Sequence, residues 1–305
     1  MEAEYVEDNV ALAVQSFLGA LNFPFRRFSL EIFSRKKERF LGADARLNGA
    51  IETFQPFYMQ FKRPSAYPDY STSRIISDRA ALGVGSSPHA LFFALRKKRR
   101  NQIEFQHNAL FELRQGLIAA GTGEAAYVCP LMLDLDSYLA AAHRSGLLHL
   151  AAFWRRRPWR LEEVLIRSGG KSVAFERIPL LAEHVTVPPH IRVTSADHQY
   201  SFDDSGGQLC FHEPTFLPEG SSNLGSFLTA IVERFLAGEG NLARGDADAV
   251  LLNLMERAYG EGGSLEVLGT DPIGRWQEFG YRLNRDFGIV QYAFTRWKRA
   301  PFDYD

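Results

Sequence analysis

The chain has 305 residues, of which 46% are hydrophobic and 23% are charged, so it can bury a sizeable core and does not resemble a disordered chain. Lys and Arg number 35 against 36 Asp and Glu, and the resulting net charge of −1 excludes a uniformly basic surface for nucleic acid. The two cysteines, Cys129 and Cys210, are too few for a disulfide framework.

No segment has the pattern of a targeting or membrane-spanning sequence. The first eight residues are acidic, the opposite of the basic start of a signal peptide. The most apolar stretch, Leu147 to Trp154, is far shorter than the roughly 20 residues that span a bilayer. We therefore expect a cytoplasmic protein that does not contact a membrane.

The first half of the chain has the pattern of a mixed α/β layer. Apolar residues recur at helical spacing from Val6 to Leu21, and Asn48-Gly49 is a strong signal for a tight turn between two strands. The elements predicted in chain order are a helix over 5–21, strands over 25–33, 40–47 and 54–62, a loop over 64–73, a strand over 89–95, a helix over 101–119, a strand over 125–133 and a helix over 134–143. This order predicts a mixed central sheet flanked by helices.

The second half has a different pattern. Residues 160–215 are rich in predicted strands, whereas 224–238 and 245–259 are predicted helices. Beyond them we expect a helix near Trp276 and a strand over 288–294. The chain is therefore divided into an α/β domain, residues 1–160, and a C-terminal α+β region, residues 161–305, for a partner, a substrate or self-association.

Polar residues gather on one side of the strand predicted over 54–62. Because side chains alternate along a strand, Gln60 and Lys62 share a face with Tyr58. The opposite face, directed into the core, consists of Phe57, Met59 and Phe61. The turn at Asn48-Gly49 allows the preceding strand to fold back, which would bring Asp44 close to Gln60 and Lys62.

The first helix offers a further acidic residue. Glu7 lies on the helical line that continues through Ala11, Val14 and Leu18, which borders the apolar stripe. We therefore expect Glu7 to face the sheet, where a carboxylate is costly unless it has a cationic partner.

These residues together resemble the PD-(D/E)XK nuclease superfamily, and within it the Mrr-like restriction endonucleases and the Holliday-junction resolvases. The resemblance covers about residues 1–145 and uses Glu7, Asp44 and Gln60-Phe61-Lys62, a QXK variant of the (D/E)XK element. It implies a restriction-endonuclease-like fold for the N-terminal domain and metal-dependent hydrolysis of phosphodiester bonds. It also implies a setting in restriction or antiviral defence.

The resemblance assigns a role to each of these residues. Asp44 would ligate Mg²⁺ or Mn²⁺, and the amide oxygen of Gln60 and the backbone carbonyl of Phe61 would complete the coordination. Lys62 would orient or deprotonate the attacking water, and Glu7 would add a second negative charge. The chemistry is consistent, because Mg²⁺ prefers hard oxygen ligands and a nearby ammonium stabilises charge on a phosphate.

The pattern departs from that of the family in two ways. No proline precedes Asp44, and the acidic residue of (D/E)XK is replaced by the neutral Gln60. Glu38 and Glu52 are rival acids near the expected site. The missing acid favours an alternative function, a noncatalytic nuclease-like scaffold or interaction subunit of a defence complex. A third alternative is an unrelated α/β protein in which Asp44 and Lys62 lie far apart.

Candidate substrate contacts follow the strand predicted over 89–95. Arg96, Lys97 and Lys98 begin a basic run suited to a phosphate backbone, and Gln106 lies where the family's helix turns polar residues toward DNA. We therefore expect a nucleic acid, namely DNA, as the substrate. The near-neutral net charge argues against tight unaided binding, so a partner protein or a second copy is expected to assist.

Overall fold

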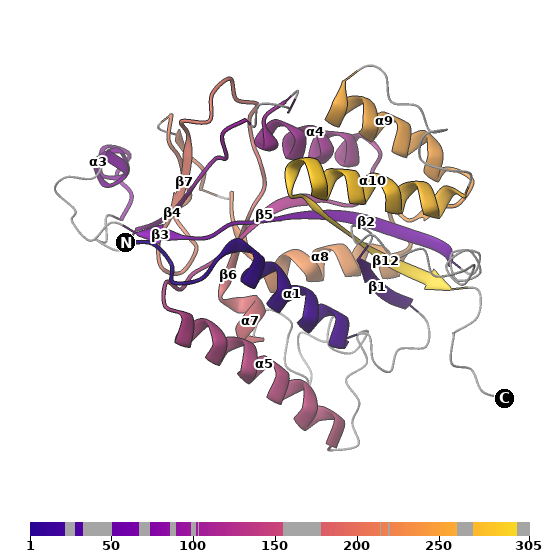
Figure 1. Ribbon diagram of the computed structural model, residues 1–305, viewed down its shortest axis with the longest axis horizontal. Coiled ribbons are helices and arrows are strands. Elements are labelled where there is room, and N and C mark those ends of the chain that lie inside the picture. Colours follow the sequence, from indigo (N-terminus) through magenta and orange to yellow (C-terminus); the bar gives the residue numbers. More distant parts are fainter. Residues whose placement is uncertain are drawn as a thin grey trace.

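The computed structural model shows an α/β protein with a mixed sheet, flanking helices and a second, antiparallel sheet (Figure 1). The residues that the structure describes are 1–21, 28–32, 51–66, 74–85, 90–98, 102, 104–154, 178–213, 215–218, 220–260 and 271–297. Within these ranges no helix is long and apolar enough to cross a membrane.

The larger sheet contains both parallel and antiparallel strand pairs. Its strands, in their order across the sheet, are β1 (Phe28–Ile32), β12 (Val290–Trp297), β2 (Ile51–Phe61), β5 (Ala125–Pro130), β6 (His184–Val187) and β10 (Ser222–Asn223), with β11 (Leu242–Ala243) paired to β2 outside this path. β2 runs antiparallel to β12 and parallel to β5.

The smaller sheet is antiparallel and lies at one end of the larger one (Figure 1). Its strands, in order, are β3 (Ser65–Ala66), β4 (Leu91–Ala94), β7 (Gln199–Phe202), β8 (Cys210–Phe211) and β9 (Thr215–Phe216). β3 follows β2 closely in the chain, so the end of β2 lies where the two sheets meet. The polar residues of the candidate site are at this junction.

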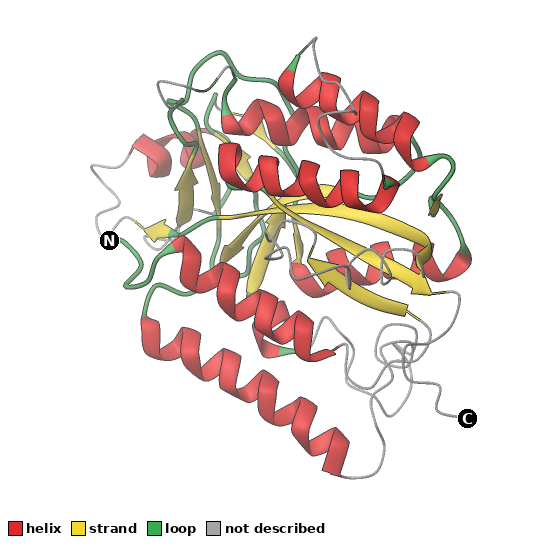
Figure 2. Cartoon of the chain, turned by 45° about the vertical axis from the view of Figure 1, so that its right-hand side comes forward, coloured by secondary structure: helices red, strands yellow, loops and turns green. Residues whose placement is uncertain are grey.

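Helices cover both faces of the larger sheet (Figure 2). They are α1 (Glu7–Leu21), α4 (Gln106–Ala119), α5 (Leu135–Trp154), α7 (Pro179–Ala182), α8 (Leu224–Ala237), α9 (Ala247–Tyr259) and α10 (Pro272–Phe287), whereas α3 (Arg74–Ala81) lies beside the smaller sheet. In Figure 1, α4, α9 and α10 lie above the sheet, and α1, α5 and α7 lie below it.

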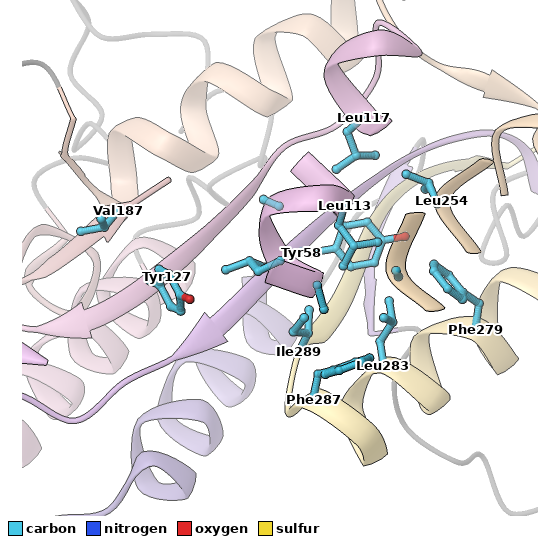
Figure 3. Close-up of a cluster of buried hydrophobic side chains, with 14 of the residues drawn as sticks. Tyr58, Leu113, Leu117, Tyr127, Val187, Leu254, Phe279, Leu283, Phe287 and Ile289 are labelled. Carbon is cyan, nitrogen blue, oxygen red and sulfur yellow. The ribbon is translucent and has the colours of Figure 1, made fainter. Parts of the chain in front are cut away.

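The alternation predicted along β2 is confirmed. Phe57, Met59 and Phe61 belong to a buried cluster that includes apolar residues of α1 and α8. Tyr58 belongs to a second buried cluster, formed with α4, α9 and α10 (Figure 3). β2 is therefore a central strand with a hydrophobic core on each face.

The face of β2 that carries Gln60 and Lys62 is also buried, which the alternation does not predict. Gln60 is 1% exposed and Lys62 is 3% exposed, because α4 and α10 cover the side of β2 that carries them. Buried polar groups need hydrogen-bond partners, and a buried ammonium is costly. These two side chains therefore need specific neighbours.

Most predicted elements correspond to observed ones. The helices expected over 5–21, 224–238 and 245–259 are α1, α8 and α9, and the helix expected near Trp276 is α10. α3 was not predicted. The strand expected over 40–47 lies outside the described residues.

Strands from both sides of residue 160 share the larger sheet. β6, β10, β11 and β12 come from the C-terminal region, and β12 lies between β1 and β2 of the N-terminal one. The two regions expected from the sequence thus contribute strands to one sheet and side chains to the same two cores.

Candidate functional site

A pocket of about 440 Å³ lies at the junction of the two sheets. Its walls come from the N-terminal segment, the start of α1, the end of β2 with β3, and β4. The lining residues are Met1, Glu2, Glu7, Lys62, Arg63, Ser65, Ala66, Phe92, Phe93 and Ala94. The pocket thus brings together two residues predicted for the site, Glu7 and Lys62, from different elements.

Lys62 directly follows β2 and is the most unusual charge in the pocket. Its Nζ donates to Oε1 of Gln106 at 3.2 Å and lies 5.5 Å from the centroid of the Tyr127 ring. Burial lowers the pKa of Lys62 to about 8, an effect that the nearby Glu7 opposes and Arg96 reinforces. A lysine with this pKa changes its charge near physiological pH, which is typical of functional sites.

Gln60 lies two residues before Lys62 on the same face of β2, beneath α10. Its Nε2 donates to the backbone carbonyl of Phe287 at 3.2 Å. Its Oε1 is buried and has no hydrogen-bond partner among the described residues. An orphaned carbonyl oxygen costs about 1–3 kcal/mol, so a donor or a cation at this oxygen would stabilise the site.

Glu7 is the first residue of α1 and lines the pocket beside Lys62, as expected for a carboxylate turned toward the sheet. The positive end of the helix dipole favours an acidic residue at this position. Glu7 Oε2 lies 3.5 Å from Nη2 of Arg96, and the two side chains are 37% and 41% exposed. An ion pair this exposed contributes little to stability, so Glu7 or Arg96 can bind a ligand in place of the other.

Gln106 begins α4 and is 4% exposed. Its Oε1 accepts from Lys62, and its Nε2 donates to the carbonyl of Phe287. Both polar ends of the predicted substrate contact are therefore used inside the protein, where they join β2, α4 and α10.

The basic residues predicted to contact substrate follow β4. Arg96, Lys97 and Lys98 are all exposed, and Arg96 lies beside Glu7 at the pocket. Residues 99 and 100 of the same basic run lie outside the described residues.

The main-chain groups of Phe61 point away from β5. The N–H groups of Tyr58 and Lys62 donate to the carbonyls of Glu124, directly before β5, and of Val128 in β5. Phe61 is an odd number of positions from both, so its main-chain groups face the opposite edge of β2. On that edge the pairing with β12 ends at Met59, opposite Val290. The Phe61 carbonyl predicted to coordinate metal is thus beyond the β12 pairing.

Three predicted features, namely Asp44, Glu38 and the Asn48-Gly49 turn, lie outside the described residues. Glu52, the other rival acid, is exposed near the start of β2, roughly 30 Å from Lys62 at the spacing of an extended strand. Glu52 is therefore too distant to act with Lys62.

The residues present fit a divalent cation only in part. Gln60 supplies an orphaned oxygen and Glu7 a carboxylate, both of them hard ligands. Among the described residues no group of three His, Cys, Asp or Glu side chains could hold a metal ion. A metal site here would therefore need at least one further carboxylate besides Glu7.

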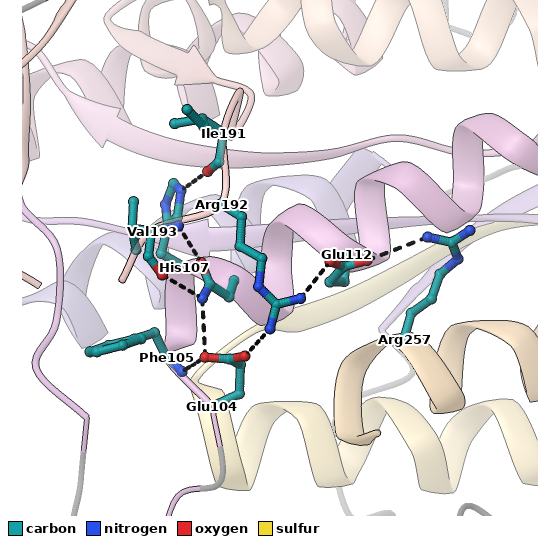
Figure 4. A network of polar contacts seen from close by, with 9 residues as sticks. Glu104, Phe105, His107, Glu112, Ile191, Arg192, Val193 and Arg257 are labelled. Carbon is teal, nitrogen blue, oxygen red and sulfur yellow. Dashed lines mark hydrogen bonds and ion pairs between the residues drawn. The ribbon is translucent and has the colours of Figure 1, made fainter. Parts of the chain in front are cut away.

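A polar network fixes the start of α4 behind the site (Figure 4). Glu104 accepts from the Phe105 N–H at 2.8 Å and pairs with Arg192, which also donates to Glu112 at 2.9 Å. Glu112 in turn pairs with Arg257 of α9 at 3.3 Å. The network holds the first turn of α4, and hence Gln106, in place.

His107 connects the first turn of α4 to β5 through hydrogen bonds. Its Nδ1 lies 2.8 Å from the hydroxyl of Tyr127, and its Nε2 lies 2.7 Å from the carbonyl of Ile191. Burial lowers the pKa of His107 to about 4, although the Ile191 carbonyl acts in the opposite direction. The imidazole is therefore neutral at physiological pH and positions Tyr127, whose ring faces Lys62.

A second buried polar cluster lies in the smaller sheet. His212 Nδ1 is 3.1 Å from Asp78 Oδ2, and His212 Nε2 is 2.9 Å from Ser201 Oγ, an order that resembles a hydrolase triad. However, Ser201 is fully buried, and its oxygen accepts from Arg79 at 3.1 Å. Because no substrate can reach this hydroxyl, we assign the cluster to anchoring α3 against the sheet.

Two contributors to the site were missed from the sequence. The carbonyl of Phe287 receives both glutamine amides, and Gly288 follows it with a φ of +66°. A backbone carbonyl carries no residue-type signal, although a glycine after a predicted helix was visible.

Comparison of the chain with known protein families, curated proteins and solved structures finds no match. The function is therefore inferred from the chemistry of the site.

Proposed function

We propose that the protein is a metal-dependent nuclease that hydrolyses phosphodiester bonds of DNA, with the scissile phosphate in the pocket beside Lys62. The observation that carries the proposal is the buried ammonium of Lys62, with its pKa lowered to about 8, next to a pocket that Glu7 also lines. The mixed sheet, with parallel β2 and β5 and helices on both faces, supports a restriction-endonuclease-like fold.

Lys62 would act on the phosphate and on the attacking water. Below about pH 8 it is mainly an ammonium, which stabilises the negative charge that develops on the phosphate. Above that pH it is mainly an amine, which can accept a proton from water. Gln106, whose Oε1 accepts from Nζ, holds the ammonium in position.

The metal ligands in this proposal are Asp44, the Oε1 of Gln60 and the carbonyl of Phe61. When bound, Mg²⁺ would supply Lewis-acid stabilisation of the phosphate and lower the pKa of a water ligand. Gln60 has the orphaned oxygen that such a cation needs, and Glu7 adds negative charge nearby.

Binding of the DNA backbone is assigned to Arg96, Lys97 and Lys98. All three are exposed, and the preceding residues of β4 line the pocket. Because these side chains contact phosphates, this binding should weaken steeply with added salt. Because the chain has a net charge of −1, it should benefit from a partner or a second copy.

The alternative is a noncatalytic scaffold in a defence complex, and one observation favours it. Gln60 is neutral, and its Nε2 bonds to Phe287 within the core. An amide binds a divalent cation more weakly than a carboxylate does. A fold with Gln60 at this position therefore depends less on a bound metal.

The test compares DNA cleavage by the full chain, Lys62→Met and Asp44→Asn with Mg²⁺ or Mn²⁺. The matched control is Arg74→Met, which removes an 87% exposed cation on α3. We expect cleavage by the wild type and the control, and a loss of about 100-fold or more in the two site variants. Equal cleavage by all four proteins would indicate a contaminant, and absence of cleavage with either metal would favour the scaffold.

A further inference from the structure

The C-terminal end of α10 receives hydrogen bonds from three glutamine side chains. The carbonyl of Phe287 accepts from Nε2 of Gln60 at 3.2 Å and from Nε2 of Gln106, and the carbonyl of Asp286 accepts from Gln102. The last carbonyls of a helix have no partner within it. These amides therefore cap α10 while two of them belong to the Lys62 site.

The capping determines which way the two site amides face. An amide group has a donor end and an acceptor end, so a bond that holds its nitrogen also directs its oxygen. With both nitrogens at Phe287, the oxygen of Gln106 faces Nζ of Lys62, and the oxygen of Gln60 has no partner among the described residues. One backbone carbonyl thus orients both acceptors.

Gly288 allows α10 to end at this position. It adopts the left-handed conformation, with φ +66° and ψ 24°, and its N–H returns to the carbonyl of Asn284 at 2.8 Å. A Cβ at Gly288 would lie 3.3 Å from Nε2 of Gln106 and 3.9 Å from Nη1 of Arg96. Glycine is therefore favoured here by its backbone conformation, and an added Cβ would press on Nε2 of Gln106.

The helix end also suits the charges around it. The C-terminus of a helix carries a partial negative charge, which favours nearby cations. Arg96 lies beside Gly288, and Lys62 is joined to Phe287 through Gln106.

We propose that the end of α10 is a positioning element of the Lys62 site, in which Phe287 orients Gln60 and Gln106 and Gly288 leaves the space that they need. The catalytic consequence rests on the proposed nuclease function, whereas the effect on the two glutamine amides does not. The C-terminal region thereby completes a site whose other residues come from the N-terminal region, residues 1–160.

The test compares Gly288→Ala with Gly238→Ala. Gly238 also follows a helix in the left-handed conformation, with φ +81°, but a Cβ there meets no atom within 4 Å. The two variants therefore introduce similar backbone strain, and only the first presses on Gln106. The readout is the NMR signals of the Gln60 and Gln106 side-chain amides in the full-length protein, assigned with Gln60→Ala and Gln106→Ala.

We expect Gly288→Ala to shift the side-chain amide signals of Gln60 and Gln106, because the added Cβ presses on Nε2 of Gln106, and Gly238→Ala to leave them unchanged. If the nuclease is active, Gly288→Ala should lower kcat about tenfold or more with little change in KM. Unchanged amide signals of both glutamines in Gly288→Ala would overturn the proposal. If Gly288→Ala does not fold, Gly288→Asn carries a Cβ on a residue that tolerates this conformation better.

A double-mutant cycle tests whether Gly288 acts through Gln106. In a Gln106→Ala background the contact is absent, so Gly288→Ala should no longer shift the Gln60 amide signal. Independent, additive effects would contradict the proposal. Glutamine amide signals that respond in a protein without nuclease activity would support the positioning role and refute the proposed function. Full activity with unresponsive amide signals would do the reverse.

Discussion

Replacing Lys62 by Met should stabilise the fold while abolishing the proposed activity. In the folded protein the ammonium is buried and bonds to the neutral Gln106, and burial lowers the pKa of Lys62 from 10.5 to about 8. At 1.36 kcal/mol for each pKa unit, this difference destabilises the folded state at neutral pH by about 3 kcal/mol. Met has a similar length and no charge.

The pH dependence has a definite sign. Below about pH 8 both the folded and the unfolded chain hold the Lys62 proton, so the full penalty applies. Between pH 8 and 10.5 only the unfolded chain binds it, so the wild type gains stability as the pH rises. Lys62→Met also leaves the Gln106 oxygen without its donor, which costs about 1 kcal/mol. The net gain should be about 2 kcal/mol near pH 7 and should vanish near pH 10.

Urea unfolding followed by circular dichroism at about pH 7 and about pH 10 measures both quantities. Arg74→Met, at an 87% exposed side chain, is the control and should change stability by less than about 0.5 kcal/mol. If Lys62→Met is less stable than the wild type near neutral pH, or if the difference between them does not depend on pH, the reasoning is refuted. Confirmation would show that the fold tolerates a destabilising charge, as expected of a functional group rather than a packing residue.

Two further predictions concern the stability of the fold. Burial lowers the pKa of both His107 and His184 to about 4, so the unfolded chain binds more protons as the pH falls from 6.5 to 4. Stability should fall across this window by up to about 3 kcal/mol for each histidine; a urea midpoint with the same acid dependence in wild type and His184→Gln would contradict this. At Gly123, with φ +50°, an added Cβ would lie 2.0 Å from the carbonyl of Pro56, and Gly123→Ala should cost more than about 3 kcal/mol. Gly121→Ala, where φ is +64° and no atom lies within 4 Å, should cost only about 1–2 kcal/mol, and equal unfolding midpoints for the two variants would show that the close contact is not decisive.

Local patterns predicted much of the secondary structure and part of the site. Apolar residues at helical spacing identified α1, and strand alternation placed Phe57 and Tyr58 on opposite faces of β2. The same alternation placed Gln60 and Lys62 on one face, and the line of Glu7 along α1 turned it toward the sheet. Each of these predictions uses geometry that repeats within one element, so neighbouring residues determine the result.

The missing parts of the site depend on contacts between distant residues. Phe287 contributes a backbone oxygen to Gln60, which lies 227 positions away, and no side-chain type marks that role. The sequence also does not predict that β12 pairs with β2, because strand pairing depends on which edges meet in space.

The sequence by itself determined the α/β character of the chain, the position of most helices and the faces of β2, because each follows from the fixed period of a helix or a strand. Only the tertiary structure decided that the polar face of β2 is buried under α4 and α10, and that Lys62 therefore holds its proton less tightly than an exposed lysine does. Burial depends on how the layers assemble. It lowers the pKa of Lys62 within an otherwise ordinary QXK sequence.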